Sequence, residues 1–248
     1  MTLKSSREIA SMQLAGKITR GALRAAERMV RPGVTTADID SAVEDFILSA
    51  GATPSFKNYE GFPASACVSV NGEVVHGIPS RERVLKEGDI VSVDAGAYID
   101  GFHGDAARTF PVGKISPDAA RLIEVTRQCF YEGLRFARLG YRIGDISGAI
   151  QDYAESHGYS VVRELIGHGV GRNLHEAPDV PNYRMRSPGI RLQEGLTIAV
   201  EPMINAGSRR VHVLDNGWTV VTDDGAYSAH YENSIAITDG EPLILTAD

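Results

Sequence analysis

The sequence predicts an α+β fold made of two related halves, about residues 1–115 and 116–248. In each half, segments with apolar residues at helical spacing precede short segments rich in β-branched residues. Gly33 and Gly140, which lie 107 positions apart, each begin the pattern G-x-x-x-x-D-I-x-x-A. Because the order of elements and this motif repeat together, we infer a duplicated helix–helix–strand unit.

The first half is expected to begin with two helices and to end in strands. Between the helices, the segment RPGVTTADID supplies a Pro-Gly break followed by Thr and Asp residues that can cap a helix. Asp100-Gly101 is typical of a tight hairpin turn between the last two strands. The expected helices cover residues 5–30 and 37–50, and the expected strands cover residues 66–70, 90–98 and 106–112.

The second half repeats this order, and the offset of 107 persists along it. It pairs Asp94 with Glu201, each at the end of an apolar run. A pseudo-two-fold axis between the halves would bring these two carboxylates together. The expected helices cover residues 117–138 and 143–157, and the expected strands lie near residues 160–165, 195–204, 218–221 and 228–238.

Composition excludes several classes of protein. The net charge of −7 argues against a general nucleic-acid binder, because phosphate backbones select clustered Lys and Arg. The first ten residues lack an apolar signal core, and no segment approaches the roughly 18 apolar residues of a membrane span. The two cysteines, Cys67 and Cys129, lack the spacing of a disulfide framework or a zinc knuckle. We therefore expect a cytoplasmic protein that acts on neither membranes nor nucleic acids.

Two pairs of carboxylates are candidates for a metal site. In a hairpin with an even-length loop, the odd separation between Asp94 and Asp105 places both side chains on one face. Glu201 in IAVEPM and Glu232 in HYENSIAIT lie beside apolar strands, where a bare charge is costly. Pro202 removes a backbone donor and suggests a strand edge or bulge. Each acid alone is also compatible with a strand cap, a solvated turn or a surface ion pair.

Three histidines lie in segments that could present them to such a site. GHGVGRNLH places His168 and His175 among glycines, which suggests a tight loop, and His76 follows the apolar run EVV. A lone histidine is also compatible with a structural role. Four carboxylates and one histidine would fit a pair of divalent metals, and this ligand set leaves Mn, Fe, Co and Zn open.

The order Asp94, Asp105, His168, Glu201, Glu232 resembles the metal-ligand set of type I methionine aminopeptidases. These enzymes share the pita-bread (creatinase/aminopeptidase) fold with prolidases, in which duplicated α-α-β halves surround a central antiparallel sheet. The resemblance spans essentially the whole chain, which implies a single catalytic domain over residues 1–248. The segments that carry it are PASACVSVNGEVVHGIP, VSVDAGAYIDGFHGDAARTF, GHGVGRNLHEAP, VEPMINAGS and YENSIAIT.

The resemblance implies a role for each of these residues. Asp94 and Asp105 would bind one metal, and Asp105 and Glu232 would bridge it to a second metal that His168 and Glu201 also hold. Glu201 would act as the base for the attacking water. His175 would contact the carbonyl oxygen and His76 the scissile amide nitrogen, while the methionine side chain would lie against Tyr59, Phe62, Cys67, Leu174 and Trp218.

Two positions depart from the family pattern. Leu174 stands where an aromatic residue is common, and Asn233 stands where histidine is frequent. The first could alter the shape of the methionine pocket, whereas the reaction should survive both. The resemblance further implies a monomer that removes the initiator methionine from nascent proteins, prefers a small second residue and associates at most transiently with the ribosome.

Two other functions are compatible with parts of the pattern. An Xaa-Pro aminopeptidase or prolidase uses a similar ligand set, but these relatives carry an additional N-terminal domain, and only about 75 residues precede His76 here. A metal-free pita-bread protein would bind peptides without cleaving them. Such proteins lose ligands, whereas all five ligand positions are filled in this sequence.

Overall fold

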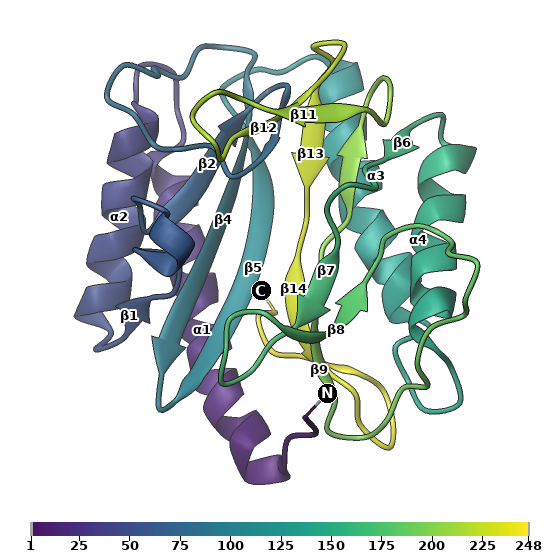
Figure 1. Ribbon diagram of the computed structural model, residues 1–248. Helices are drawn as coiled ribbons and strands as arrows, with labels where there is room; N and C mark the ends of the chain where they lie inside the picture. Colours follow the sequence, from purple (N-terminus) through teal and green to yellow (C-terminus); the bar gives the residue numbers. More distant parts are fainter. Residues whose placement is uncertain (1, 248) are drawn as a thin grey trace.

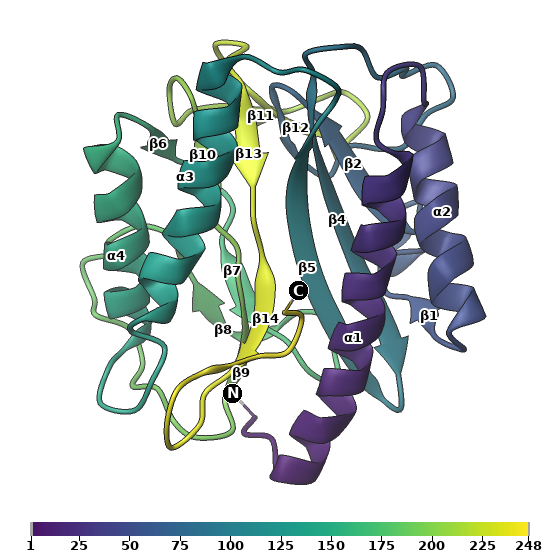
Figure 2. The same ribbon diagram turned by 180° about the vertical axis from the view of Figure 1, so that it is seen from behind.

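The helices of the protein lie on one face of its strands, as two views of the computed structural model show (Figures 1 and 2). The structure describes residues 2–247. Helices α1 (Ser6–Met29) and α2 (Thr36–Ser49) cover the strands of the first half, and α3 (Pro117–Leu134) and α4 (Ile143–Ser156) cover those of the second. Among the described residues, no helix is long and apolar enough to cross a membrane.

The first half contains the long hairpin that the sequence predicts. Strands β4 (Ile90–Ile99) and β5 (Phe102–Pro111) pair antiparallel along their whole length, and β1 (Thr53–Pro54) and β2 (Ala66–Val70) pair with β4. Asp100 and Gly101 both have positive φ, of 52° and 82°, as a two-residue turn of this kind requires. Capping boxes at Ser5 and Thr35 begin the two helices.

The strands of the second half lie in three sheets, two of which contain only strands from this half. One has the order β15 (Leu243–Ile244), β14 (Asn233–Ala236), β9 (Thr197–Val200), β7 (Gly167–Gly169) and β8 (Glu176–Val180). The other has the order β13 (Ser228–His230), β10 (Met203–Asn205) and β6 (Ser160–Val161). A third sheet, formed by β11 (Val211–Val213), β12 (Val220–Thr222) and β3 (Glu73–Val75), joins segments from both halves.

The predicted duplication is visible in the positions of the elements. Helices α2 and α4 begin at Thr36 and Ile143, and β1 and β6 begin at Thr53 and Ser160, each pair 107 residues apart. Isolated β-bridges link Thr35 to Val84 and Arg142 to Arg191, which are again related by the same offset. The two halves therefore repeat not only their helices but also the bridge that links the start of the second helix to the segment before β4 or β9.

Several boundaries differ from the sequence prediction. Helix α3 ends at Leu134, four residues early, and β6 has only two residues. The strand expected over residues 195–204 is interrupted at Glu201-Pro202, where Pro202 lacks the backbone donor that a continuous ladder needs. The strand expected over residues 228–238 is likewise interrupted at Tyr231-Glu232. Apolar periodicity cannot reveal these breaks, because the residues on either side remain buried.

Each half has its own hydrophobic core between helices and strands. The core of the first half includes Leu23, Ile39 and Val93, and that of the second includes Phe130, Ile146 and Ile198. The halves meet where β5 runs beside the break between β13 and β14. There Ala107 and Glu232 exchange backbone hydrogen bonds, with N···O distances of 3.0 and 3.4 Å. The seam between the two halves therefore passes directly beside the predicted ligands.

Candidate metal centre

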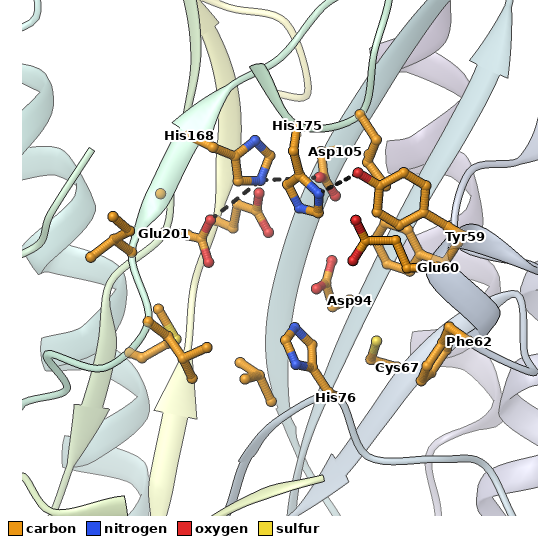
Figure 3. Close-up of a pocket in the computed structure, with 18 of the residues that line it drawn as sticks. Tyr59, Glu60, Phe62, Cys67, His76, Asp94, Asp105, His168, His175 and Glu201 are labelled. Atoms are coloured by element: carbon orange, nitrogen blue, oxygen red, sulfur yellow. Dashed lines mark hydrogen bonds and ion pairs between the residues drawn. The ribbon is translucent and has the colours of Figure 1, made fainter. Parts of the chain in front are cut away.

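A cavity of about 510 Å³ opens between the two halves, on the side opposite the helices. Figure 3 shows side chains from both halves that point into it. All twelve residues predicted to form the site line this cavity: Tyr59, Phe62, Cys67, His76, Asp94, Asp105, His168, Leu174, His175, Glu201, Trp218 and Glu232. The volume lies within the usual range for a site that holds a small ligand or a peptide end.

Asp94 and Asp105 reach the cavity from the same face of the β4–β5 hairpin. In the register of this hairpin, Asp94 lies opposite Ala107 and Asp105 lies opposite Gly96. Side chains alternate along each strand, so Asp94, Gly96 and Asp105 share one face, as the parity of the sequence separation predicts. The side chain of Asp105 is 4% exposed, which makes it one of the most buried acids in the protein.

Glu201 and Glu232 enter from the two strand interruptions of the second half. Glu201 immediately follows β9, whereas Glu232 is separated from the end of β13 by Tyr231 and immediately precedes β14. The amide of Asn182 donates to the carbonyl oxygen of Glu201 at 3.0 Å, which holds the interrupted backbone in place. The breaks free the two side chains from the regular alternation of a strand and allow both to face the cavity.

His168 lies on strand β7, not in the tight loop that the sequence suggested. The flanking glycines permit close packing: a Cβ on Gly167 would lie 2.4 Å from the carbonyl oxygen of Ala199, and one on Gly169 would lie 2.6 Å from that of Ala177. The Nδ1 atom of His168 is 2.9 Å from the carbonyl oxygen of Gly169. Its Nε2 atom therefore faces the carboxylates, 3.7 Å from Asp105 Oδ2 and 3.5 Å from Glu201 Oε1.

The buried carboxylates are electrostatically unfavourable without a cation. Burial raises the pKa of Asp105 to about 7, and burial with the charge of Asp105 holds that of Asp94 well above its usual range. Burial and the neighbouring aspartates likewise raise the pKa of Glu201 and Glu232. One oxygen each of Asp94, Asp105 and Glu232 is buried without a hydrogen-bond partner. Unpaired, converging carboxylate oxygens are what a divalent cation would satisfy, so the residues present fit the implied metals.

The structure adds one residue that the sequence prediction missed. His230, at the end of β13, is 1% exposed, and its Nε2 atom is 3.7 Å from Glu201 Oε2 and 3.8 Å from Glu232 Oε2. Asp94, His230 and Glu232 form one group that could hold a metal ion, and Asp105, His168 and Glu232 form another. The only sequence signal was its position two residues before Glu232, which places both side chains on one side of an extended segment.

His175 and His76 lie on opposite sides of the acidic cluster (Figure 3). The Nδ1 atom of His175 is 2.9 Å from the hydroxyl oxygen of Tyr59, and its ring packs edge-on against His168 with centroids 4.2 Å apart. His76 adopts a left-handed backbone with φ of 58°, which is unusual for a residue with a side chain. Burial lowers the pKa of His76 to about 4 and also lowers that of His175, so both rings are neutral at pH 7.

Apolar side chains form one wall of the cavity. Tyr59, Phe62, Cys67, Leu174 and Trp218 belong to a single hydrophobic cluster, with the rings of Phe62 and Trp218 edge-on at 5.2 Å. Asn233 points elsewhere: its Oδ1 atom accepts hydrogen bonds from Arg108 and Thr246 and is buried outside the cavity. Leu174, which differs from the pattern that the sequence resembles, therefore forms part of the apolar wall of the cavity. Asn233, which also differs from that pattern, instead contributes to the packing behind this wall.

Comparison with known proteins groups the chain with metallopeptidases. The model of metallopeptidase family M24 matches residues 10–239. A methionine aminopeptidase of Clostridium acetobutylicum is 53% identical over 244 residues, with 98% of each chain covered. Methionine aminopeptidase 1 of Bacillus subtilis is 51% identical over 243 residues, again with 98% of each chain covered.

The solved structures give the same grouping. The crystal structure of a methionine aminopeptidase from Thermotoga maritima superposes with a TM-score of 0.98 over the full length of both chains, at 44% identity. A prolidase from Pyrococcus furiosus superposes with a TM-score of 0.81 at 22% identity, and 65% of its chain is covered. The similarity to the prolidase shows a shared fold.

Proposed function

Because the chain belongs to metallopeptidase family M24, we propose that it is a metal-dependent aminopeptidase that removes the N-terminal methionine from peptides and nascent proteins. The observation that carries this proposal is the cavity itself, in which converging buried carboxylates adjoin an apolar wall. Full-length similarity above 50% to methionine aminopeptidases supports the same activity.

The five predicted ligands would hold two divalent metals. Asp94 and Asp105 reach the site from one half, and His168, Glu201 and Glu232 reach it from the other. Metals bound there would supply an activated water and positive charge that polarises the scissile carbonyl group. The mixture of oxygen and nitrogen donors accommodates Co, Mn, Fe or Zn.

Three side chains would act on the peptide bond. Glu201 would accept the proton of the attacking water, because its carboxylate lies in the cavity among the proposed metal ligands, 3.5 Å from His168 Nε2. His175 would donate a hydrogen bond to the carbonyl oxygen as negative charge develops there. His76, on the other side of the carboxylates, would contact the amide nitrogen of the leaving peptide.

The apolar wall would bind the methionine side chain. A thioether packs favourably against aromatic rings, and Tyr59, Phe62 and Trp218 surround this end of the cavity. The five predicted pocket residues would therefore select methionine, and the space near His175 would select a small second residue.

The same proposal implies a location, an oligomeric state and a domain organisation for the enzyme. Initiator methionine is removed as chains leave the ribosome, so we place the enzyme in the cytoplasm, acting as a monomer with at most transient ribosome contact. Residues 1–248 would act as a single catalytic domain, because neither half supplies the complete ligand set.

Peptide hydrolysis by metal-stripped protein, resupplied with Mn²⁺ or Co²⁺, tests the proposal. We expect methionine release from Met-Ala-Ser that depends on added metal, little release from Met-Leu-Ser, and none in Glu201→Ala. Cleavage of only Ala-Pro-Ala would instead assign the chain to the proline-specific relatives. Absence of any cleavage, with metal bound, would favour a peptide-binding protein.

A further inference from the structure

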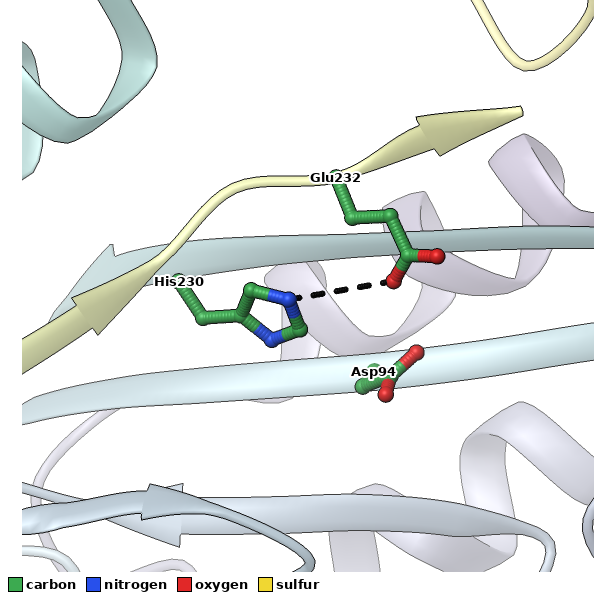
Figure 4. A group of neighbouring side chains, drawn as sticks. All are labelled: Asp94, His230 and Glu232. Atoms are coloured by element: carbon green, nitrogen blue, oxygen red, sulfur yellow. Dashed lines mark ion pairs between the residues drawn. The ribbon is translucent and has the colours of Figure 1, made fainter. Parts of the chain in front are cut away.

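His230 is a buried imidazole without a hydrogen-bond partner for one of its nitrogens. Thr109 fixes its backbone: the hydroxyl oxygen accepts from the His230 N–H and the hydroxyl donates to the His230 carbonyl oxygen, both at 2.9 Å. The backbone that carries the ring is therefore held in place from the first half of the chain. The Nε2 atom of the ring has no hydrogen-bond partner and points at the carboxylates (Figure 4).

The distances around this nitrogen are those of ligands that could share one ion. Nε2 lies 3.7 Å from Glu201 Oε2 and 3.8 Å from Glu232 Oε2, beyond hydrogen-bonding distance. Two donor atoms that are each about 2.1 Å from one ion lie about 3.0 to 3.4 Å apart in octahedral or tetrahedral sites. Small side-chain movements would therefore bring His230 and Glu232, the carboxylate shared by the two ions, onto a common ion.

The two candidate ligand groups have matching composition. One contains Asp105, His168 and Glu232, and the other contains Asp94, His230 and Glu232, with the donor atoms of each group within 4.8 Å of one another. Each group thus has an aspartate, a histidine and the shared glutamate. Without His230, the ion on the Asp94 side would have only oxygen donors.

We propose that His230 is a sixth protein ligand and binds, through Nε2, the metal ion on the Asp94 side. This inference rests on the proposed dinuclear centre. It gives each ion one imidazole nitrogen, and a nitrogen donor added to an otherwise all-oxygen ligand set shifts the preference of that position from hard ions such as Mn²⁺ toward Co²⁺, Fe²⁺ or Zn²⁺.

Proton NMR of the protein fully loaded with Co²⁺ tests this directly, independently of turnover. An imidazole bound to Co²⁺ through Nε2 keeps its proton on Nδ1, and the paramagnetic ion shifts that exchangeable resonance far downfield. We expect two such resonances in the unsubstituted protein, from His168 and His230. His230→Gln should retain one, and the exposed control His212→Gln should retain both.

Co²⁺ affinity gives a second measurement. Calorimetric titration of His230→Gln should show one of the two ions bound at least about tenfold more weakly, with His212→Gln unchanged. A single shifted resonance in the unsubstituted protein, lost in His168→Gln, would overturn the proposal for His230 and leave the dinuclear centre standing. No shifted resonance, and no Co²⁺ binding, would overturn the metal centre and with it this inference.

Discussion

His175 illustrates how one side chain is oriented before a substrate arrives. Its Nδ1 atom is engaged by the hydroxyl of Tyr59 at 2.9 Å, and its ring packs against His168. With one nitrogen occupied and the ring face fixed, the other nitrogen can serve the carbonyl oxygen without losing further rotational freedom. A donor fixed in this way is more effective at stabilising a developing charge than one that must be ordered during the reaction.

We therefore expect His175→Ala to lower kcat for Met-Ala-Ser by about a hundredfold to a thousandfold. Metal content, measured by elemental analysis, should remain unchanged, since His175 is not among the proposed ligands. Tyr59→Phe is the matched control, because it removes only the hydroxyl that orients the ring and should cause a smaller loss. A decrease in kcat of less than threefold in His175→Ala would contradict the proposed role.

Lys4 and Glu176 form an ion pair that stabilises the chain segment next to the cavity. Their ion pair has a distance of 2.6 Å and side chains only 3% and 11% exposed. Glu176 immediately follows His175 and also accepts a hydrogen bond from the N–H of Asn173. The N-terminal segment is thereby attached to the turn that carries His175.

Removing this lysine should destabilise the protein in a pH-dependent way. Lys4→Met removes the cation from the largely buried Glu176 carboxylate and leaves it only backbone N–H donors, and breaking a buried ion pair in this way costs up to about 3 kcal/mol. Burial raises the pKa of Glu176, but the hydrogen bond from Lys4 and other contacts outweigh it, so the net pKa is lowered. A lowered folded-state pKa gives stability that is present above the unfolded-state value and is lost as pH falls. Urea unfolding should therefore show a larger difference between Lys4→Met and the unsubstituted protein at pH 7 than at pH 3.5; an equal difference would argue against this explanation.

At the scale of elements, helix α1 approaches strand β5 closely enough to require a glycine. A Cβ on Gly104 would lie 2.7 Å from the backbone nitrogen of Gly16. Thr19, on the same helix face, contacts the carbonyl oxygen of Gly104 and accepts a hydrogen bond from the N–H of Ala97, both at 3.1 Å. The helix is therefore docked by backbone contact, with little room for adjustment.

We expect Gly104→Ala to lower the free energy of unfolding by about 2 to 3 kcal/mol, because the clash involves backbone and can be relieved only by moving the helix. Chemical denaturation measures this difference. Gly240→Ala is a matched control, since its nearest neighbour would lie 3.9 Å away and its backbone has no positive φ. Equal stability of the two variants would show that α1 can shift freely.

At the scale of the whole molecule, the duplicated architecture was predictable from sequence, whereas the interruptions that form the site were only partly so. The 107-residue offset and the parity between Asp94 and Asp105 follow from periodicities that the backbone imposes. Pro202 indicated a strand edge or bulge through its missing donor, and the structure has a strand interruption there. No comparable signal in the sequence marks the strand break at Glu232. His230 cannot be distinguished from an ordinary buried histidine by sequence alone, because its proximity to the carboxylates depends on β13 lying beside β5.

The four buried carboxylates that meet in the cavity predict how the stability of the metal-free protein depends on pH. The folded pKa of Asp105 is about 7, and those of Asp94, Glu201 and Glu232 are also raised, whereas unfolded carboxyl groups titrate near 4. Between about pH 4 and pH 7 these four carboxyl groups therefore bind more protons in the folded state than in the unfolded state, so their contribution to stability falls as pH rises through this window. Burial lowers the pKa values of His76, His168 and His230, and these histidines contribute in the opposite sense. Thermal unfolding of metal-stripped protein therefore isolates the carboxylate contribution by comparison with a carboxylate variant.

Added Co²⁺ or Mn²⁺ should raise the Tm more at pH 7.5 than at pH 5.5, because ions bind the deprotonated carboxylates and compete with protons. Asp94→Asn removes one of the four charges and should change the pH dependence of the metal-free Tm, raising the Tm relative to the unsubstituted protein more at pH 7.5 than at pH 5.5. Asp118→Asn, which neutralises an acid in the first turn of α3, is the control and should leave that dependence unchanged. An equal Tm difference between Asp94→Asn and the unsubstituted protein at the two pH values would mean that the four carboxylates do not repel one another as this arrangement requires.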